Sequence, residues 1–303
     1  MEKTIFSEAM EGIAIDEVVR DQEFTMTMNH FHDTYELYFL LEGERYYFIE
    51  KETYHIKTGD IVLVNRQQVH KTSQAGSRPH DRILLQLGGR SLEPWMKNMG
   101  LNSLEKTFKD YYGVIRLSGE EWEEMKELLL GIKDELGRRR ERYEVMVRLQ
   151  LARILLIIYR NRKKAVLGEA LPTVQTAKHG KVHEVAEYLT LHCETGESLE
   201  QLAKRFYVSK SYLSRIFREV TGFSVNEYRS LARIRRAREL LAGSEYSITE
   251  ISEMLGFESV TYFERVFKKH GGGTPLKYRK EAVTSPAPRK VPPAPAPAHR
   301  PWA

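Results

Sequence analysis

Arginine, lysine and small hydroxyl side chains recur at matching helical positions in two separate stretches of the 303-residue chain. In the first stretch these outward-facing polar positions are Ser209, Lys210, Ser211, Ser214, Arg215 and Arg218. In the second stretch they are Ser259, Thr261, Glu264, Arg265, Lys268 and Lys269, and Arg279 follows. Arginine and lysine donate to guanine, glutamate accepts from cytosine, and basic side chains attract phosphate. The two stretches therefore indicate a nucleic-acid interface.

The two stretches belong to an internal duplication. Corresponding residues lie 49 or 50 positions apart: Leu202 and Ile251, Tyr212 and Tyr262, Phe217 and Phe267, Tyr228 and Tyr278. Each copy opens with a capping-box pattern, at Ser198–Gln201 and at Ser247–Glu250, which starts a short helix. A turn and a longer helix follow, as in a helix-turn-helix unit, whose second helix lies in the major groove. We predict such units at about residues 199–220 and 247–270.

The position of each polar residue on the second helix of its unit suggests its role. We expect three residues of each helix to contact base edges, namely Lys210, Ser214 and Arg215, and Thr261, Glu264 and Arg265. The remaining basic residues, Arg218, Lys268, Lys269 and Arg279, are expected on phosphates, where they fix register rather than sequence.

A predicted helix ending at Gly243 connects the two units, and the chain around it is strongly basic. About 16 helical residues span ~24 Å, which together with the units' own widths could set the two recognition helices ~34 Å apart, one turn of DNA. From Lys204 to Arg238 there are ten basic and two acidic residues, whereas the whole chain carries only +5. We expect this region to dominate salt-dependent affinity and the second unit to tune the choice of site.

The segments YLSRIFREVTG and ITEISEMLGFESVTYFERVFKKHGGGTPLKYRK resemble the DNA-binding domain of the AraC/XylS family of bacterial regulators. The family pattern is met at Ile248, Ile251, Gly256, Phe257, Tyr262, Phe263, Phe267, Lys268, Lys269, Gly272, Thr274, Pro275, Tyr278 and Arg279. Ser252 departs from the family's usual alanine, a small residue for a small one. The resemblance implies a transcription regulator, more often an activator, that binds promoter or operator DNA, with RNA polymerase as a further candidate partner. Two long amphipathic helices expected between the domains predict a homodimer, and the alternative is that they only pack against the β domain.

Strand-like segments fill the chain from Ile13 to about Gly88, and they carry a possible ligand set. His30, His32, Glu36 and His70 have the spacing of the two cupin motifs, so this region resembles a cupin barrel. Asn65, Gln67 and Gln74 depart from those motifs, and related regulators use the barrel as an effector pocket, often without metal. We expect no cofactor and a small hydroxylated effector, such as a carbohydrate, bound by a polar set comprising His30, His32, Glu36, Tyr38, Tyr46 and His70.

Three alternatives stay open for the cupin-like region. In a metal-dependent cupin enzyme with an accessory helical domain, His30, His32, Glu36 and His70 would ligate a divalent ion, since imidazole and carboxylate suit Fe, Mn, Ni or Zn. An architectural DNA-binding protein would bind no ligand at all. The histidines could also be satisfied core residues.

The fold class expected from these patterns is multidomain, β then α. We predict a cupin-like β-barrel domain over residues 1–90, a helical connector that is expected to mediate dimerisation over 91–166, a linker over 167–180, an all-α DNA-binding domain over 181–281 and a disordered proline-rich tail over 282–303. The single cysteine, Cys193, cannot form an internal disulfide. With no apolar run of signal-peptide or bilayer-spanning length, the sequence predicts a cytoplasmic protein without membrane contact. The resemblance to regulators implies that the protein is not an enzyme.

Overall fold

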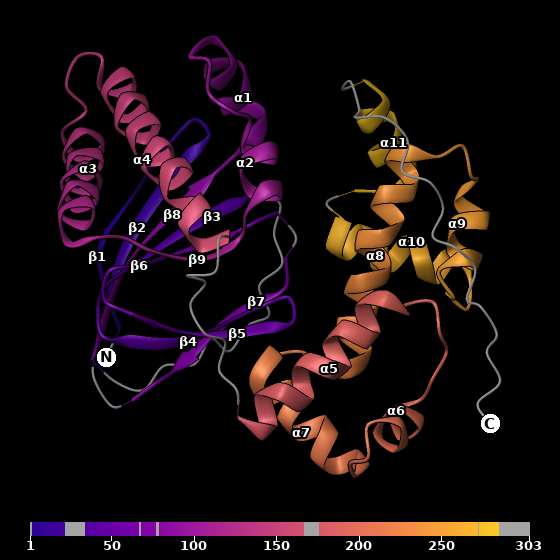
Figure 1. Ribbon diagram of the computed structural model, residues 1–303. Helices are drawn as coiled ribbons and strands as arrows, with labels where there is room; N and C mark the ends of the chain where they lie inside the picture. The colour runs from indigo at the N-terminus through magenta and orange to yellow at the C-terminus, as the bar shows by residue number, and fades with distance from the viewer. Residues whose placement is uncertain are drawn as a thin grey trace. The chain divides into compact units, whose positions relative to one another are not determined.

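The computed structural model describes residues 2–21, 34–66, 68–76, 79–166, 176–271 and 273–284 (Figure 1). His30, His32 and Gln67 lie outside the described residues, as do the linker segment 167–175 and the tail from residue 285. The chain divides into two compact units, Met1–Glu187 with Leu199–Val225, and Tyr188–Ser198 with Asn226–Ala303. The first unit holds the β-rich domain and the first helix pair of the duplication, and the second unit holds the second helix pair.

Two antiparallel sheets build the β-rich domain of the first unit. The larger sheet has the strand order β1 (Glu2–Met10), β2 (Ile13–Arg20), β8 (His80–Leu87), β3 (Tyr35–Glu42), β6 (Asp60–Val64) and β9 (Gly113–Arg116). The smaller sheet has the order β5 (Glu52–Lys57), β4 (Glu44–Ile49) and β7 (His70–Gln74). The predicted N-terminal β domain is confirmed, and its described strands pair as two sheets rather than as one closed barrel.

Both faces of β3 are buried, because the large sheet is covered on both sides. Leu37 and Phe39 belong to a core that also contains Met125 and Leu151 from the helices α3 (Gly119–Arg138) and α4 (Tyr143–Val166). Figure 1 shows these two helices side by side over the large sheet. On the opposite face, Tyr38 and Leu40 pack in a second core with residues of β4, β5 and β6.

The segment after residue 90, for which the sequence predicted helices, also contains a strand. Helices α1 (Gly89–Asn98) and α2 (Leu104–Asp110) precede β9, which pairs with β6 at the edge of the large sheet. Asp60 at the start of β6 is fully buried and accepts two hydrogen bonds of 2.7 Å from the Arg116 guanidinium at the end of β9. At four residues, β9 is too short to be distinguished from a loop by periodicity.

The two helix-turn-helix units are present where the duplication predicted them. The first consists of α6 (Leu199–Arg205) and α7 (Lys210–Thr221), preceded by α5 (Ala177–Leu191). The second consists of α9 (Ile248–Met254) and α10 (Val260–Gly271), followed by α11 (Pro275–Thr284), and α8 (Val225–Gly243) is the predicted connector. The capping box at Ser247 and Glu250 is formed, and Ser252 is buried as a small residue should be. No helix among the described residues is long and apolar enough to cross a membrane.

The turns of the two units share a backbone conformation but use different residues to adopt it. Tyr207 and Gly256, which correspond at an offset of 49, both adopt the left-handed conformation, with φ of 56° and 68°. A Cβ on Gly256 would collide with the carbonyl oxygen of Glu194, so glycine is required there. Tyr207 adopts the same conformation with a Cβ and is therefore strained. Its side chain is 94% exposed.

Substitutions at the two turn residues should therefore change the free energy of unfolding in opposite directions. Gly256→Ala is expected to cost at least ~2 kcal/mol through strain and collision, whereas Tyr207→Gly should stabilise by roughly 1 kcal/mol. Thermal and urea unfolding of the full chain would measure both changes. Gly243→Ala is the matched control, because nothing lies within 4 Å of a Cβ there. Equal effects of the two alanine variants would contradict this account.

Candidate functional site

Helix α7 begins and ends at defined residues and has one buried face. The Ser209 hydroxyl accepts from the Tyr212 backbone N–H at 3.2 Å, and Gly222 closes the helix in the left-handed conformation. Leu213, Ile216 and Phe217 are fully buried, since they lie on the side that packs into the unit. The opposite face is exposed and carries Lys210, Ser211, Ser214, Arg215 and Arg218.

Helix α10 repeats this construction in the second unit. The Ser259 hydroxyl accepts from the Tyr262 backbone N–H at 3.2 Å. Phe263 and Phe267 are buried in a chain of aromatic contacts that joins them to Phe257 and Tyr278, with ring centroids 5.0–5.7 Å apart. The exposed face carries Ser259, Thr261, Glu264, Arg265, Lys268 and Lys269. The structure thus places twelve of the thirteen predicted DNA-contacting residues on the free faces of the two recognition helices.

Arg279 is the thirteenth predicted residue, and it is engaged within its own unit. Its guanidinium donates to the backbone carbonyl of Tyr246, just before α9, and the residue is only partly exposed. This contact ties α11 to the segment that starts the second helix-turn-helix unit. The sequence pattern could not distinguish this structural contact from a phosphate contact.

Several arginines of the basic stretch also serve the fold rather than the surface. Arg229 and Arg238 are only 8% and 5% exposed. The Arg238 guanidinium lies over the rings of Phe267 and Tyr278, at 5.8 and 5.1 Å from their centroids. Arg233 donates to the carbonyls of Cys193 and Thr195 at 2.6 and 3.2 Å, and burial lowers the pKa of Arg233. Residue counting therefore overstated the surface charge between Lys204 and Arg238.

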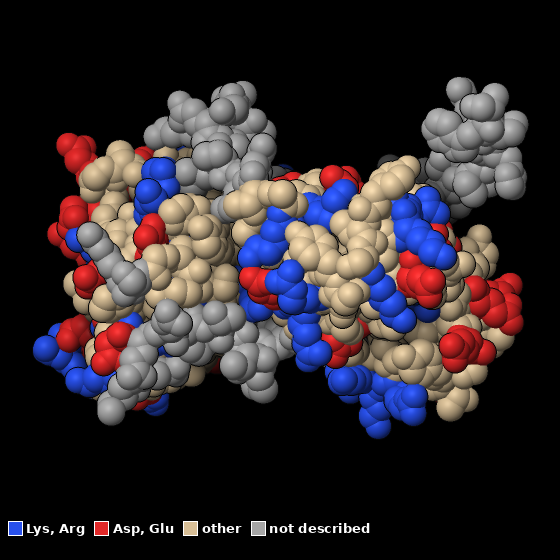
Figure 2. Space-filling model, turned by 90° about the horizontal axis from the view of Figure 1, so that it is seen from below, with Lys and Arg blue, Asp and Glu red and all other residues tan. Residues whose placement is uncertain are grey.

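Between Lys204 and Arg238, the basic residues that remain exposed lie on the first helix-turn-helix unit. Lys204, Arg205, Lys210, Arg215 and Arg218 are all exposed there. Figure 2, which views the molecule from the side on which α6 and α7 lie in Figure 1, shows Lys and Arg side chains gathered in clusters over this region. Such a surface attracts phosphate without sequence preference.

The interior between the two sheets holds part of the predicted effector set. Glu36 on β3 and His70 on β7 are buried, with His70 Nε2 3.3 Å from Glu36 Oε2. Gln86 donates to Glu36 at 3.0 Å, and His70 Nδ1 lies 2.9 Å from the Gln68 carbonyl. Tyr38 is buried beside them, and burial raises the pKa of its hydroxyl.

Register decides which tyrosine of β4 joins this interior. Tyr47 packs edge-on against Tyr38, at 5.2 Å between ring centroids, and stacks parallel to His70 at 6.3 Å. Tyr46 instead lies on the other face of β4, near the rings of His55 and His179. Successive side chains of a strand point to opposite faces, so Tyr47, and not the predicted Tyr46, faces the interior that holds His70.

Buried cations add a feature of this interior that the sequence analysis missed. Arg45 is completely buried and donates to Thr72 Oγ1 and Gln74 Oε1, both at 3.1 Å. Burial lowers the pKa of Arg45 to about 10. Arg20 Nη1 lies 3.3 Å from His80 Nε2, and burial together with the nearby guanidiniums lowers the pKa of His80 to about 3, so this imidazole stays neutral and accepts.

No three His, Cys, Asp or Glu residues are grouped as metal ligands among the residues that the structure describes. Glu36 and His70 are instead held by each other and by the partners named above. His30 and His32, the other two members of the predicted metal set, fall outside those residues.

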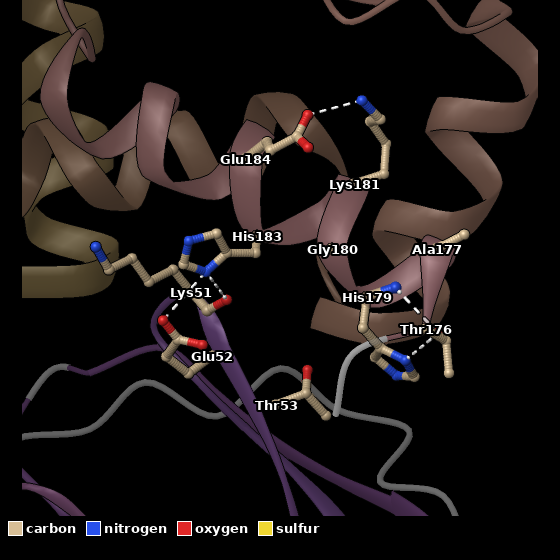
Figure 3. A pocket seen from close by; sticks show the side chains of 10 residues that line it. All are labelled: Lys51, Glu52, Thr53, Thr176, Ala177, His179, Gly180, Lys181, His183 and Glu184. Atoms are coloured by element: carbon tan, nitrogen blue, oxygen red, sulfur yellow. Dashed lines mark hydrogen bonds and ion pairs between the residues drawn. The ribbon is translucent and has the colours of Figure 1, made fainter. Parts of the chain in front are cut away.

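A cavity of about 490 Å³ lies within the first unit where β5 faces the start of α5 (Figure 3). Its charged side chains pair with one another or with a neighbour. His183 Nδ1 is 3.2 Å from Glu52, Lys181 is 2.7 Å from Glu184, and Lys51 is 2.5 Å from Glu187. The cavity therefore does not select a ligand by charge.

The β7 strand also contacts the first recognition helix within this unit. Lys71 is buried on the face of β7 opposite His70, and its ammonium donates to the carbonyl of Glu219 at 2.6 Å and to that of Arg218 at 3.4 Å. A cation at the C-terminal carbonyls of a helix is stabilised by the helix dipole. One strand thus presents His70 to the domain interior and Lys71 to the end of α7.

Two family models match the chain, one described as an AraC-like ligand binding domain over residues 17–151 and one as a helix-turn-helix domain over residues 202–281. The chain belongs to the AraC family of transcription regulators. It is therefore a DNA-binding regulator with a ligand-binding domain, as the repeated motifs had indicated. The ligand-binding model runs from within β2 into α4, so that β1 lies outside it, and the second model runs from within α6 into α11.

Curated AraC-family relatives align over most of their length. The Msm operon regulatory protein of Streptococcus mutans is 28% identical over 252 residues, which cover 82% of this chain and 85% of the relative. The transcriptional activator RhaR of Yersinia pestis is 23% identical over 274 residues, covering 86% and 87%. A solved structure of ToxT from Vibrio cholerae is 13% identical and covers 90% of this chain and 98% of its own, with a TM-score of 0.38.

The exposed faces of α7 and α10 lead to a prediction that distinguishes residues contacting base edges from residues contacting phosphates. Arg215→Ala and Arg265→Ala should each relax the preference for one base pair by about 5- to 100-fold, the value of a bidentate guanine contact. Lys268→Ala should weaken binding to all sequences alike and lower the salt slope by about 1. Titrations of specific and shuffled duplexes at several salt concentrations measure both. Uniform weakening by all three variants would contradict the assignment.

Proposed function

We propose that this AraC-family regulator is a cytoplasmic, effector-responsive activator that reads two adjacent major-groove segments with α7 and α10. The observation that carries the proposal is the repeated construction of these helices, each capped by serine, buried on its apolar face and exposing an arginine at the same position. Base edges would be contacted by Lys210, Ser214, Arg215, Thr261, Glu264 and Arg265. Phosphates would be contacted by Arg218, Lys268 and Lys269.

The effector would bind inside the β-rich domain, between the two sheets. Glu36, Tyr38 and His70 present polar atoms there within a cluster of aliphatic residues, and Tyr47, Arg45 and Gln74 lie on the same side of the small sheet. Apolar walls with a few oriented donors and acceptors suit a hydroxylated small molecule such as a carbohydrate. An activating role is supported by the naming of RhaR as a transcriptional activator, and RNA polymerase would then be a further partner.

The function is tested by coupling DNA binding to effector binding. A duplex from the promoter next to the protein's own gene should bind the full chain at least about 1,000-fold more tightly than a shuffled duplex at physiological salt. A panel of monosaccharides and sugar acids, screened by thermal shift, should contain a ligand that raises Tm and raises reporter transcription. Glu36→Gln should remove that response while leaving DNA affinity without ligand unchanged. Equal binding to both duplexes would overturn the regulator, and a Tm unmoved by the whole panel would overturn the carbohydrate effector.

Dimerisation would use the outer face of α4. Its inner face is buried through Val147, Leu151, Ile154 and Ile158, yet Met146, Leu149, Leu156 and Tyr159 are exposed at helical spacing. A cavity of about 280 Å³ lies beside this face, with Leu128, Met146 and Leu149 in its wall together with the polar residues Glu124, Glu127, Gln150 and Arg153. A second copy of α4 would bury the apolar face in a symmetric interface.

Introducing a charge on this face should separate the dimer. Leu149→Glu is expected to raise the dimer dissociation constant by more than about tenfold, because a carboxylate would lose its hydration in an apolar interface. Light scattering coupled to size exclusion measures the change. Leu276→Glu on α11 is the matched control, since Leu276 is also exposed. A Leu149→Glu protein as dimeric as the control would rule out this interface.

A further inference from the structure

An arginine lies over the ring of a tyrosine three residues earlier on both recognition helices. On α7 the Arg215 guanidinium carbon is 5.4 Å from the centroid of the Tyr212 ring. On α10 the Arg265 guanidinium carbon is 5.2 Å from the centroid of the Tyr262 ring. The two pairs correspond at an offset of 50 and belong to different compact units, so the arrangement occurs twice independently.

From this repeated geometry we infer that Tyr212 and Tyr262 are positioning residues, which hold the guanidiniums of Arg215 and Arg265 for base recognition. The inference rests on the proposed function of the two arginines. Neither tyrosine need touch DNA in this role, because each acts through its arginine.

The direction in which each arginine leans explains why the ring is useful. Long side chains on a helix point back toward its N-terminus. A recognition helix reads bases mainly with its N-terminal residues. A tyrosine one turn before the arginine therefore holds the guanidinium on the side from which bases are read, and stacking replaces part of the freedom that an exposed arginine otherwise keeps.

The fold fixes the backbone of both tyrosines, and for Tyr262 also the ring. The backbone N–H of each tyrosine is bound by the capping serine of its helix, Ser209 or Ser259, at 3.2 Å. Tyr262 also packs against the Phe257 ring, at 6.1 Å between centroids. Tyr212 is 36% exposed, which leaves one part of the ring free for the guanidinium.

A competing carboxylate makes the two units unequal. Glu219, one turn after Arg215, binds Lys178 through Oε1 at 2.5 Å, and its Oε2 lies 4.0 Å from Arg215 Nη1. This second oxygen would draw the guanidinium toward the C-terminal end of α7. The corresponding residue of the second unit is Lys269, which repels Arg265. Removal of the ring should therefore disturb the first unit more than the second.

The test compares base preferences of full-length variants selected on a randomised duplex library. Arg215→Ala defines the base pair that Arg215 reads. Tyr212→Leu should reduce the preference at that same pair by about two- to fivefold, the worth of an exposed cation–π contact, and leave the other pairs unchanged. Tyr212→Phe, which keeps the ring, should match the wild type. Tyr262→Leu should act at the Arg265 pair with a smaller effect.

A double variant isolates the competition with Glu219. Glu219→Gln combined with Tyr212→Leu should recover base preference relative to Tyr212→Leu, beyond any change that Glu219→Gln makes alone. The inference would be overturned if Tyr212→Leu left the base preference unchanged, or if Tyr212→Phe lost as much base preference as Tyr212→Leu. It would also be overturned if Tyr212→Leu weakened binding equally at every base pair. If Arg215→Ala itself alters no base preference, the failure lies instead with the proposed function.

Discussion

The burial of one apolar face on each recognition helix is the constraint from which the rest of the interface follows. Leu213, Ile216 and Phe217 fix the rotation of α7, and Phe263, Val266 and Phe267 fix that of α10. With 3.6 residues per turn, this burial leaves the arginine of each helix on the free face. The serine caps set where each helix starts, and thus which residues lie at the end that approaches DNA. Chemistry at the surface is therefore a consequence of packing in the interior.

The sequence was sufficient wherever a repeated pattern had a single structural solution. The duplication located both helix-turn-helix units and the connector ending at Gly243, because capping residues, periodicity and offset all agreed. The exposed faces of α7 and α10 followed from the same periodicity. The β-rich domain was also predicted, although its division into two sheets and the short strand β9 depend on pairings between distant residues that a single sequence does not display.

Residues whose role depends on tertiary surroundings were harder to assign. Tyr46 and Tyr47 are chemically identical neighbours, and only the register of β4 against β7 places Tyr47 beside His70. Arg229, Arg233 and Arg238 look like a basic patch in sequence, but burial and contacts with carbonyls and rings make them part of the framework. Charge counts alone do not distinguish a guanidinium that meets phosphate from one that closes a helix or covers an aromatic ring. The alternation of β7, with His70 inward and Lys71 on the carbonyls of α7, was equally invisible in sequence. It gives the β-rich domain a direct contact with the second helix of the first helix-turn-helix unit.

The central claim is that two unequal copies of one unit read adjacent major grooves from a single chain. Methylation interference on the promoter duplex tests this claim most directly, since methylation at guanine N7 blocks contacts in the major groove. The account predicts, for each bound chain, two groups of interfering guanines about 10 base pairs apart on one face of the duplex, one group being lost in Arg215→Ala and the other in Arg265→Ala. The account would be contradicted by a single group of interfering guanines per bound chain, or by a group that neither variant removes.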